Sequence, residues 1–310
     1  IGVNGLEYRD IFPMWDWCRV PGVTNPQVAM PAHEWGRMEQ HTHWTGGVSN
    51  SRWGIFTFEL DVQQTQALKS WFFFGDIVVA LGAGIRSTHP QPVVTTINQC
   101  HYENRLWRDG IAQSGELNAH AQHWLHHGNV GYVLHSASAD LKCETRSSSW
   151  QLINQHLSDH RLDAEVFELT INHGVCPNDA SYQYTLLPGA NVEQTRQYAD
   201  APKARVISNS TRTQAVMLDK WIGCVFYQAA TLNLESGLSI QVDQPCVIAC
   251  ESEAHCYSLS VATLGRGTTV NIVIVEQGRT YQTQMCTHSD AARLGESVHC
   301  YITKSVKSCV

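Results

Sequence analysis

The sequence predicts an all-β protein. Three short apolar runs rich in aromatic and β-branched residues follow one another between Lys69 and Gln99, and such runs are typical of strands buried on both faces. They are Trp71–Phe74, Ile77–Leu81 and Val93–Ile97. Glycines and prolines between the runs leave no window of ten residues for a buried helix, which is the alternative interpretation. A second series of short strands separated by turns follows residue 203.

Composition limits the class of protein. The chain has 310 residues, of which 43% are hydrophobic and 16% charged, and its formal net charge is -7. These values indicate a globular protein and give no reason to expect nucleic acid or an anionic membrane surface as a partner. No apolar run is long enough to span a membrane, and no signal peptide is visible. Because the chain begins with Ile1, we expect a mature or trimmed product.

The N-terminal segment Ile11–Trp17 is predicted to form a strand and a turn, with Asp16 bonding to nearby backbone. A long loop, 31–54, follows before a strand at 55–60. Loops of this length inside a compact domain are usually functional.

The 31–54 loop holds the candidate site. Aromatic rings can cover the apolar face of a sugar, while amide and guanidinium groups hold its hydroxyls or carboxylates. The predicted carbohydrate-binding residues are His43, Trp44, Asn50, Arg52 and Trp53. The same loop also carries His33, Glu34, Trp35, Arg37 and His41. The alternative is that the tryptophans only pack the loop down and the polar groups are solvated.

Four histidines invite a metal interpretation, which we do not favour. His120, His123, His126 and His127 would share a face only on a helix. On a strand, His126 and His127 point to opposite faces, and no cysteine or carboxylate lies at ligand-like spacing. We therefore predict no metal and no cofactor.

Two further strands, at 166–171 and 182–187, are predicted to form a long hairpin through the turn 173–179. His173 in that turn is tempting as a base, but we favour turn stabilisation. The pattern restarts near 201–203, which predicts domains at 1–203 and 204–310. In the second domain, strands are expected at 216–218, 224–227, 239–242, 247–249, 259–261 and 270–275, as a small antiparallel sandwich.

Eleven cysteines without zinc-type spacing indicate disulfides and an oxidising compartment. Bridges are expected near Cys246, Cys250 and Cys256, and Cys309 is a candidate for linking two subunits, with a free buried thiol as the alternative. Asn209-Ser210-Thr211 is a glycosylation acceptor sequence. Together these features predict a secreted protein.

Six blocks of the sequence resemble, in the same order, the β-domains of polysaccharide lyase family eight, which includes hyaluronate, chondroitin and xanthan lyases. The blocks are EYRDIFPMWDWCRVPGVT from Glu7, GGVSNSRWG from Gly46, KSWFFFGDIVVALGAGI with VVTTINQ from Lys69, WLHHGNVGYVL from Trp124, SSSWQLIN from Ser147 and INHGVCPNDASYQYTLLPG from Ile171. The resemblance implies a large antiparallel super-sandwich, galactose-mutarotase-like, followed by the small C-terminal sandwich.

The resemblance also bears on activity. Family members eliminate the glycosidic oxygen next to a uronate, using an asparagine, a histidine, a tyrosine and an arginine carried by a helical α/α toroid. None of those motifs occurs in this sequence, and we assign no catalytic residue. In GGVSNSRWG, Asn50 matches a position near the substrate of relatives.

Two functions remain open. The first is a secreted, lectin-like glycan-binding protein that is non-catalytic on its own, as a homo-oligomer or disulfide-linked dimer. The second is the processed C-terminal chain of a lyase whose toroid is a separate chain. A structural or storage role is a weaker third.

Overall fold

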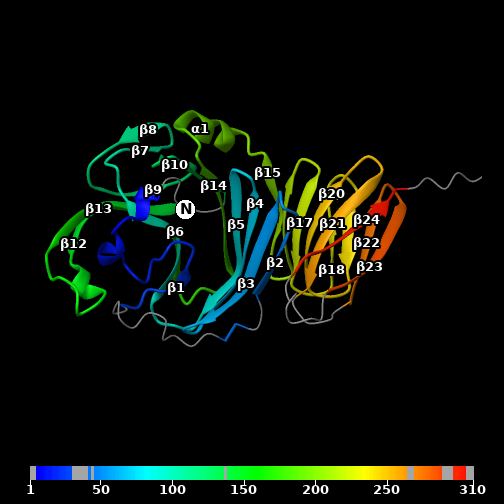
Figure 1. The fold of residues 1–310 in the computed structure, drawn as a ribbon, viewed down its shortest axis with the longest axis horizontal. Coiled ribbons are helices and arrows are strands. Elements are labelled where there is room, and N and C mark those ends of the chain that lie inside the picture. Colours follow the sequence, from blue (N-terminus) through cyan, green and yellow to red (C-terminus); the bar gives the residue numbers. More distant parts are fainter. Residues whose placement is uncertain are drawn as a thin grey trace, which may run out of the picture. The chain divides into compact units, whose positions relative to one another are not determined.

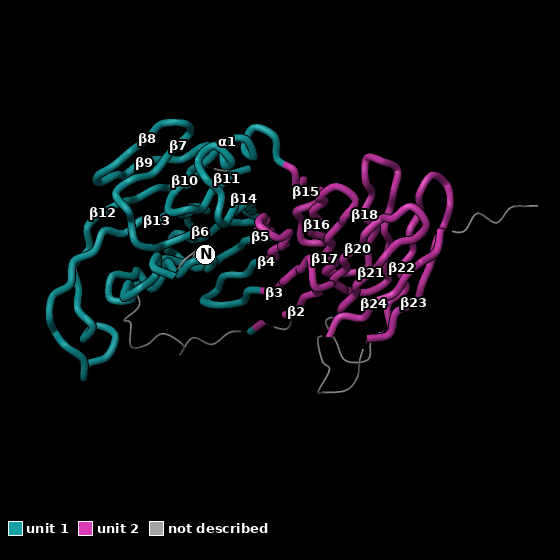
Figure 2. Tube along the Cα trace, turned by 45° about the horizontal axis from the view of Figure 1, so that its top comes forward, with its two compact units in different colours: residues 1–41, 60–67, 84–202 teal, residues 42–59, 68–83, 203–310 magenta. Residues whose placement is uncertain are grey.

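The computed structural model describes residues 5–29, 41–42, 45–135, 138–263, 269–287 and 296–304. The chain divides into two compact units (Figure 2). Unit 1 comprises 1–41, 60–67 and 84–202, and unit 2 comprises 42–59, 68–83 and 203–310. The predicted boundary near 203 stays a prediction.

A five-stranded antiparallel sheet belongs to unit 1 (Figure 1). Its order is β1 (Thr24–Pro26), β6 (Pro92–His101), β13 (Leu162–Val175), β12 (Ala139–Ser148) and β9 (Leu117–Ala121). Strand β6, between β1 and β13, is buried at every position except its two ends. This burial explains why its sequence is almost continuously apolar or β-branched.

A nine-stranded sheet contains most of the remaining strands of the first 200 residues. Its order is β2 (Thr45–Ser49), β3 (Gly54–Val62), β4 (Thr65–Phe74), β5 (Ile77–Ser87), β14 (Ala180–Pro188), β11 (Val130–Leu134), β10 (Trp124–His127), β7 (Leu106–Arg108) and β8 (Ile111–Gln113). Strands β3, β4 and β5 each have residues in both units. The three strands predicted between Lys69 and Gln99 are therefore confirmed as β4, β5 and β6.

The predicted hairpin between 166 and 187 is wrong. β13 pairs with β6 and β12, whereas β14 pairs with β11 in the other sheet. Consecutive strands usually pair, but here the turn at 176–179 carries the chain from one sheet to the next. The long loop predicted at 31–54 is also partly wrong, because β2 occupies 45–49.

Short helices complete unit 1. The segment predicted as a strand at 11–17 instead forms the 3-10 helix η2 (Phe12–Met14), after η1 (Leu6–Tyr8). Pro13 suits the first turn of such a helix because that position needs no N–H donor. Ile11 and Met14 pack against Val166, and η4 spans Trp150–Leu152. Asp16 Oδ1 accepts a hydrogen bond from Cys18 N (2.9 Å), as predicted.

The helix α1 (Val192–Asp200) was not expected from the sequence. Asn191 Oδ1 accepts from Gln194 N at 2.9 Å, and Gln194 Oε1 accepts from Asn191 N at 2.8 Å, which is a capping box. The helix packs on β11, where a Cβ at Gly131 would lie 2.4 Å from Thr195 Oγ1. Glycine at 131 is therefore required by close packing.

Unit 2 contains an antiparallel β-sandwich. The six-stranded sheet has the order β15 (Ala204–Asn209), β16 (Thr213–Leu218), β17 (Trp221–Phe226), β20 (Cys246–Ser252), β21 (Cys256–Thr263) and β24 (Val298–Thr303). The four-stranded sheet has the order β18 (Ala230–Asn233), β19 (Ser239–Val242), β22 (Thr269–Glu276) and β23 (Arg279–Cys286). Inward side chains of both sheets, such as Ile248 and Ile272, form one core. All six predicted strands are present.

The expected disulfides are not found among the ten described cysteines. Strand register explains this, because no strand pair in the described part of the sandwich places two cysteines opposite each other. Cys250 lies opposite Leu259, and Cys300 lies on the far side of the same leucine. Cys246 and Cys250 are four residues apart on one strand, beyond the reach of a bridge. Cys309 lies outside the described residues.

Within the described part of the chain, no helix has the length and apolar character needed to cross a membrane.

Candidate functional site

Asn50 lies in the turn that joins β2 to β3. Its Oδ1 accepts from Trp53 N at 2.7 Å and Arg52 N at 3.2 Å, and its own N–H donates to Trp53 O. Ser51 takes a left-handed conformation with φ of 70°. Asparagine oxygens commonly close turns in this way. The side-chain oxygen Oδ1 of Asn50 is thus used by the turn, and only the side-chain nitrogen Nδ2 is available for a ligand.

Arg52 and Trp53 follow directly in the same turn. The Arg52 guanidinium lies 4.7 Å from the centre of the Trp53 ring and is exposed. The Trp53 ring packs against Phe74 (5.7 Å) and Trp221 (5.8 Å) within unit 2. Trp53 is therefore held by packing on one side, while Arg52 remains accessible.

The other predicted site residues have mixed outcomes. His43 and Trp44 lie outside the described residues, as do His33, Glu34, Trp35 and Arg37. Asn209, the predicted glycosylation site, ends β15, with Nδ2 donating to Gly82 O at 3.2 Å and Oδ1 accepting from Gln214 Nε2 at 2.8 Å. Glycosylation of Asn209 stays a prediction, and it would require Nδ2 to leave Gly82 O.

An aromatic platform on β3 and β4, formed by Phe56, Phe58, Trp71 and Phe73, is the most distinctive surface of unit 2. The Phe58 and Trp71 rings are stacked at 5.8 Å with an angle of 10°, and Phe56 lies 5.8 Å from Trp71. Phe56 is 44% exposed and Phe73 40% exposed. Exposed aromatic surface of this kind is unusual on a soluble protein and marks binding sites.

Lys69 lies on the same face of β4 as Trp71 and Phe73, at the buried end of the platform. Its Nζ is 5.4 Å from the Trp71 ring centre and 5.8 Å from that of Phe58. The side chain has no exposed surface, and burial lowers the pKa of its ammonium group to about 7. Because it is fully buried, Lys69 is not accessible to a ligand on the exposed part of the platform, although its Nζ lies near the Trp71 and Phe58 rings.

The histidines do not assemble a metal site in the described ranges, where no three His, Cys, Asp or Glu side chains gather. His126 and His127 occupy adjacent positions of β10 and so point to opposite faces, as predicted. His126 Nε2 lies 2.8 Å from Ala190 O, while the buried His127 ring stacks on Phe167 at 4.4 Å. Burial lowers the pKa of His127 to about 4.

His173 lies on β13 and not in a turn, so the predicted turn role is wrong. Its Nε2 is 2.8 Å from Thr95 Oγ1, which in turn lies 2.7 Å from Thr24 Oγ1. This buried chain of hydroxyls fixes the imidazole to the neighbouring strands β6 and β1. His173 therefore has a structural role.

The sequence contained a signal for the platform that we did not use. Phe56 and Phe58 are two residues apart on one strand, and Lys69, Trp71 and Phe73 repeat that spacing on the next. Residues spaced by two share a face of a strand. The platform thus lies on the strands β3 and β4 and not in the loop that precedes β3.

Two family models match this chain. The model described as polysaccharide lyase family 8, super-sandwich domain, matches residues 1–199. The model described as polysaccharide lyase family 8, C-terminal beta-sandwich domain, matches residues 205–263.

Curated relatives are similar over most of this chain. Chondroitinase-AC of Pedobacter heparinus is 34% identical over 261 residues, covering 80% of this chain and 37% of the relative. Hyaluronate lyase of Thermasporomyces composti is 30% identical over 258 residues, covering 78% of this chain and 32% of the relative. The chain thus spans about a third of the length of these two relatives.

A solved structure of chondroitinase AC lyase, studied as enzyme–oligosaccharide complexes, matches with a TM-score of 0.87 and 29% identity. It covers 95% of this chain and 45% of that one. A chondroitin AC lyase of Streptomyces coelicolor A3 in complex with chondroitin sulphate matches with a TM-score of 0.80 and 24% identity, covering 97% and 42% of the two chains. This second likeness concerns the fold alone.

Proposed function

Because this chain belongs to polysaccharide lyase family 8, we propose that it binds a uronate-containing polysaccharide through the aromatic platform of unit 2. The platform supports this proposal because flat, partly exposed rings can cover the apolar C–H face of a sugar. The similar chondroitinase AC lyase has been studied in oligosaccharide complexes. Arg52, exposed in the β2–β3 turn, is a donor suited to a carboxylate.

In this proposal the chain binds polysaccharide without cleaving it by itself. β-Elimination needs a group that neutralises the carboxylate, a base, and an acid for the leaving oxygen. The family motifs that supply these groups are not in the sequence. Secretion is part of the same proposal, since polymers of this kind do not cross a membrane unaided and a protein that binds them must meet them outside the cell.

Loss of aromatic surface tests the binding site. We expect Phe56→Ala with Trp71→Ala to weaken binding of hyaluronan or chondroitin sulphate by at least tenfold, because each stacked ring contributes on the order of 1 kcal/mol or more. Tyr301→Ala is the matched control, since Tyr301 is an exposed aromatic residue elsewhere in unit 2. Equal affinities of the wild-type protein and the double variant would refute the platform as the site.

The alternative function is a part of a lyase that acts together with a helical toroid. It is favoured by the similarity to chondroitinase-AC, of which this chain covers 37%. Incubation of this chain with hyaluronan, chondroitin or alginate tests whether it cleaves by itself, and a clear rise in ultraviolet absorbance from unsaturated uronate would overturn the first function. Because both functions expect no rise from this chain alone, co-purification of a toroid chain with the native protein is the result that favours the second.

The expected protein partners depend on which of these two functions the chain has. A separate toroid chain, a homo-oligomer and a dimer linked through Cys309 all stay predictions. Intact mass of the native protein, with and without reductant, tests them together, because each state has a different mass.

A further inference from the structure

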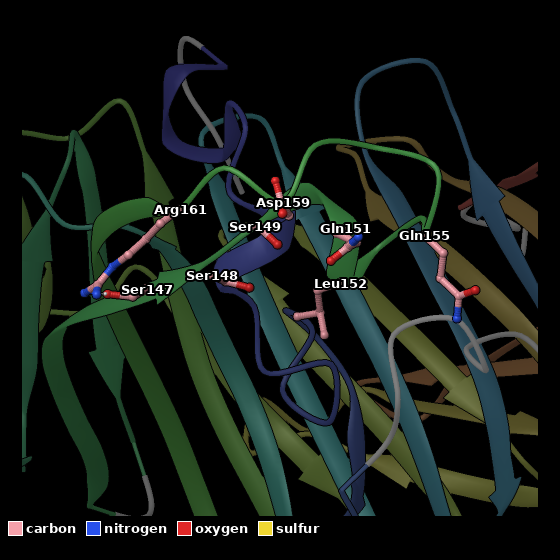
Figure 3. A pocket seen from close by; sticks show the side chains of 8 residues that line it. All are labelled: Ser147, Ser148, Ser149, Gln151, Leu152, Gln155, Asp159 and Arg161. Carbon is pink, nitrogen blue, oxygen red and sulfur yellow. Dashed lines mark hydrogen bonds between the residues drawn. The ribbon is translucent and has the colours of Figure 1, made fainter.

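A second surface, in unit 1, is hollowed and lies apart from the aromatic platform in the sequence. It is an open groove of about 800 Å³ at the end of β12, along η4 and the loop that leads to β13. The lining residues are Ser147, Ser148, Ser149, Gln151, Leu152, Gln155, Asp159 and Arg161. Figure 3 shows these side chains spread from Arg161 at one end to Gln155 at the other. The volume lies in the range of small-molecule sites.

Most polar side chains of the groove are unused by the fold. Gln151, Gln155 and Asp159 make no side-chain hydrogen bond or ion pair with any other described residue. Arg161, in contrast, is oriented, because its Nε donates to Asp163 Oδ1 at 3.1 Å and its Nη2 to Ser147 Oγ at 2.7 Å. The groove therefore offers several free donors and acceptors next to one fixed guanidinium.

Apolar side chains flank these polar groups. Leu152 lines the groove and is 49% exposed, and Phe12 of η2 is 42% exposed. The helices η2 and η4 are in contact, so Phe12 belongs to the segment that flanks the groove. A surface that alternates hydroxyl, amide and apolar groups matches the amphipathic character of a sugar ring.

The flanking segment is held rigidly. Gln99 binds both backbone groups of Asp16, with Oε1 accepting from the N–H at 2.8 Å and Nε2 donating to the carbonyl at 3.1 Å. Arg146 Nη1 donates to Met14 O at 3.2 Å. Glu168, only 2% exposed, anchors the arrangement by accepting from both Arg19 and Arg146. Phe12 is thus placed by a network that the fold itself maintains.

We propose that this groove is a second carbohydrate-binding site, which holds a sugar of the polysaccharide through its hydroxyl groups. The carboxylate of Asp159 accepts from vicinal hydroxyls, and Gln151 and Gln155 both donate and accept. Leu152, which lines the groove, covers the apolar side of the sugar. This inference rests on the proposed polysaccharide-binding function, and adds a site that does not depend on the platform.

The charges of the groove explain why we choose hydroxyls and not an anionic group. Arg161 is neutralised by Asp163, and Asp159 adds a negative charge. Since no net positive charge is left, attraction to a carboxylate or sulfate does not contribute. Binding at this site is therefore expected to change less than threefold between 50 and 300 mM NaCl.

Hydrogen exchange of the whole chain with hyaluronan and chondroitin sulphate hexasaccharides tests the proposal. We expect both to slow exchange in peptides covering 147–161. The double variant Gln151→Ala, Asp159→Ala should lose this protection and about tenfold in affinity, the equivalent of one or two hydrogen bonds. Glu116→Ala with Gln241→Ala is the control, because it removes an exposed acid and amide elsewhere.

The outcomes separate this inference from the proposed function. Protection of 54–74 alone, with no change at 147–161 in the wild-type protein, overturns the second site and leaves the platform intact. Affinity that falls tenfold or more with salt, in a Phe56→Ala, Trp71→Ala background, overturns recognition through hydroxyls. If neither hexasaccharide binds the wild-type protein, both proposals fail. Matching circular dichroism and melting of the variants and the wild-type protein shows that the variants are folded.

Discussion

Replacement of Lys69 by methionine should change how stability depends on pH. Lys69 is fully buried beside the stacked rings of Phe58 and Trp71, and burial lowers the pKa of its ammonium group from 10.5 to about 7. Between these two values the unfolded chain binds a proton that the folded chain has released. The free energy of unfolding of the wild-type protein therefore gains, from this group, about 1.4 kcal/mol per pH unit as pH rises through the window.

The expected magnitude follows directly. From pH 7 to pH 9 the Lys69 contribution rises by about 2 kcal/mol, since the group is already half deprotonated at the lower value. Lys69→Met keeps an unbranched stem beside the rings and removes the amine. The variant lacks this rise. The difference in free energy of unfolding, wild-type protein minus variant, should therefore be about 2 kcal/mol larger at pH 9 than at pH 7. Any change in stability that is the same at all pH values does not affect this difference, which reflects the missing rise.

Urea unfolding at pH 7, 8 and 9, followed by tryptophan fluorescence, measures this difference. Thiols such as Cys250, whose pKa burial raises to about 12, act in the opposite direction above pH 8, but they are present in both proteins and cancel. Lys203→Met, at an exposed position, is the control. Its free energy of unfolding should change with pH in parallel with that of the wild-type protein. Parallel curves for Lys69→Met would show that Lys69 titrates normally and would refute the reasoning.

Three further changes test other parts of the structure. Glu168→Gln should destabilise the protein by about 3–5 kcal/mol in urea unfolding, because it leaves Arg19 and Arg146 without their shared buried carboxylate; a loss below 1 kcal/mol would contradict this. Asn191→Ala removes the cap of α1 and should cost about 1 kcal/mol, whereas Asn191→Asp keeps the acceptor and should cost little. Asn50→Asp preserves the acceptor for Trp53 N but removes the amide donor, so weaker glycan binding without a lower melting temperature would assign the contact to Nδ2; unchanged affinity would place recognition elsewhere.

Much of the fold could be predicted because burial leaves a local mark in the sequence. β5 and β6 are buried on both faces and read as nearly continuous apolar runs. The family models confirm the predicted super-sandwich and C-terminal sandwich. The sequence of a strand does not show which other strand it pairs with. The predicted pairing of β13 with β14 is wrong for this reason, because the two strands are neighbours in sequence but belong to different sheets.

The helices η2 and α1 could not be predicted from the local sequence pattern either. Ile11 to Trp17 is as apolar and aromatic as a strand, but Pro13 and the contacts of Ile11 and Met14 with Val166 favour a tight 3-10 turn. The capping box at Asn191 and Gln194 was readable in principle. α1 itself carries few apolar residues, with only Thr195 and Tyr198 buried, so its periodicity is weak.

The candidate site was missed for a reason that lies in the strands themselves. On β3 the buried positions are 55 and 57 at one end but 60 and 62 at the other, so the buried face changes partway along the strand. β4 does the same, from 65, 67 and 69 to 70, 72 and 74. A strand with one buried face would keep a single alternation throughout. The change coincides with the division of β3 and β4 between the two units, each of which has its own core.

This change of face produces the platform. Phe56 and Phe58 lie on the same face of β3 as Leu60 and Val62, which are buried in unit 1. In the part of β3 that holds the two phenylalanines, however, the opposite face is the buried one. Their rings therefore remain partly exposed, although their residue type predicts burial. Lys69 lies at the switch on β4 and is fully buried. A strand that serves two cores in turn leaves an apolar face uncovered for part of its length, and in this protein that face is aromatic and suited to a sugar.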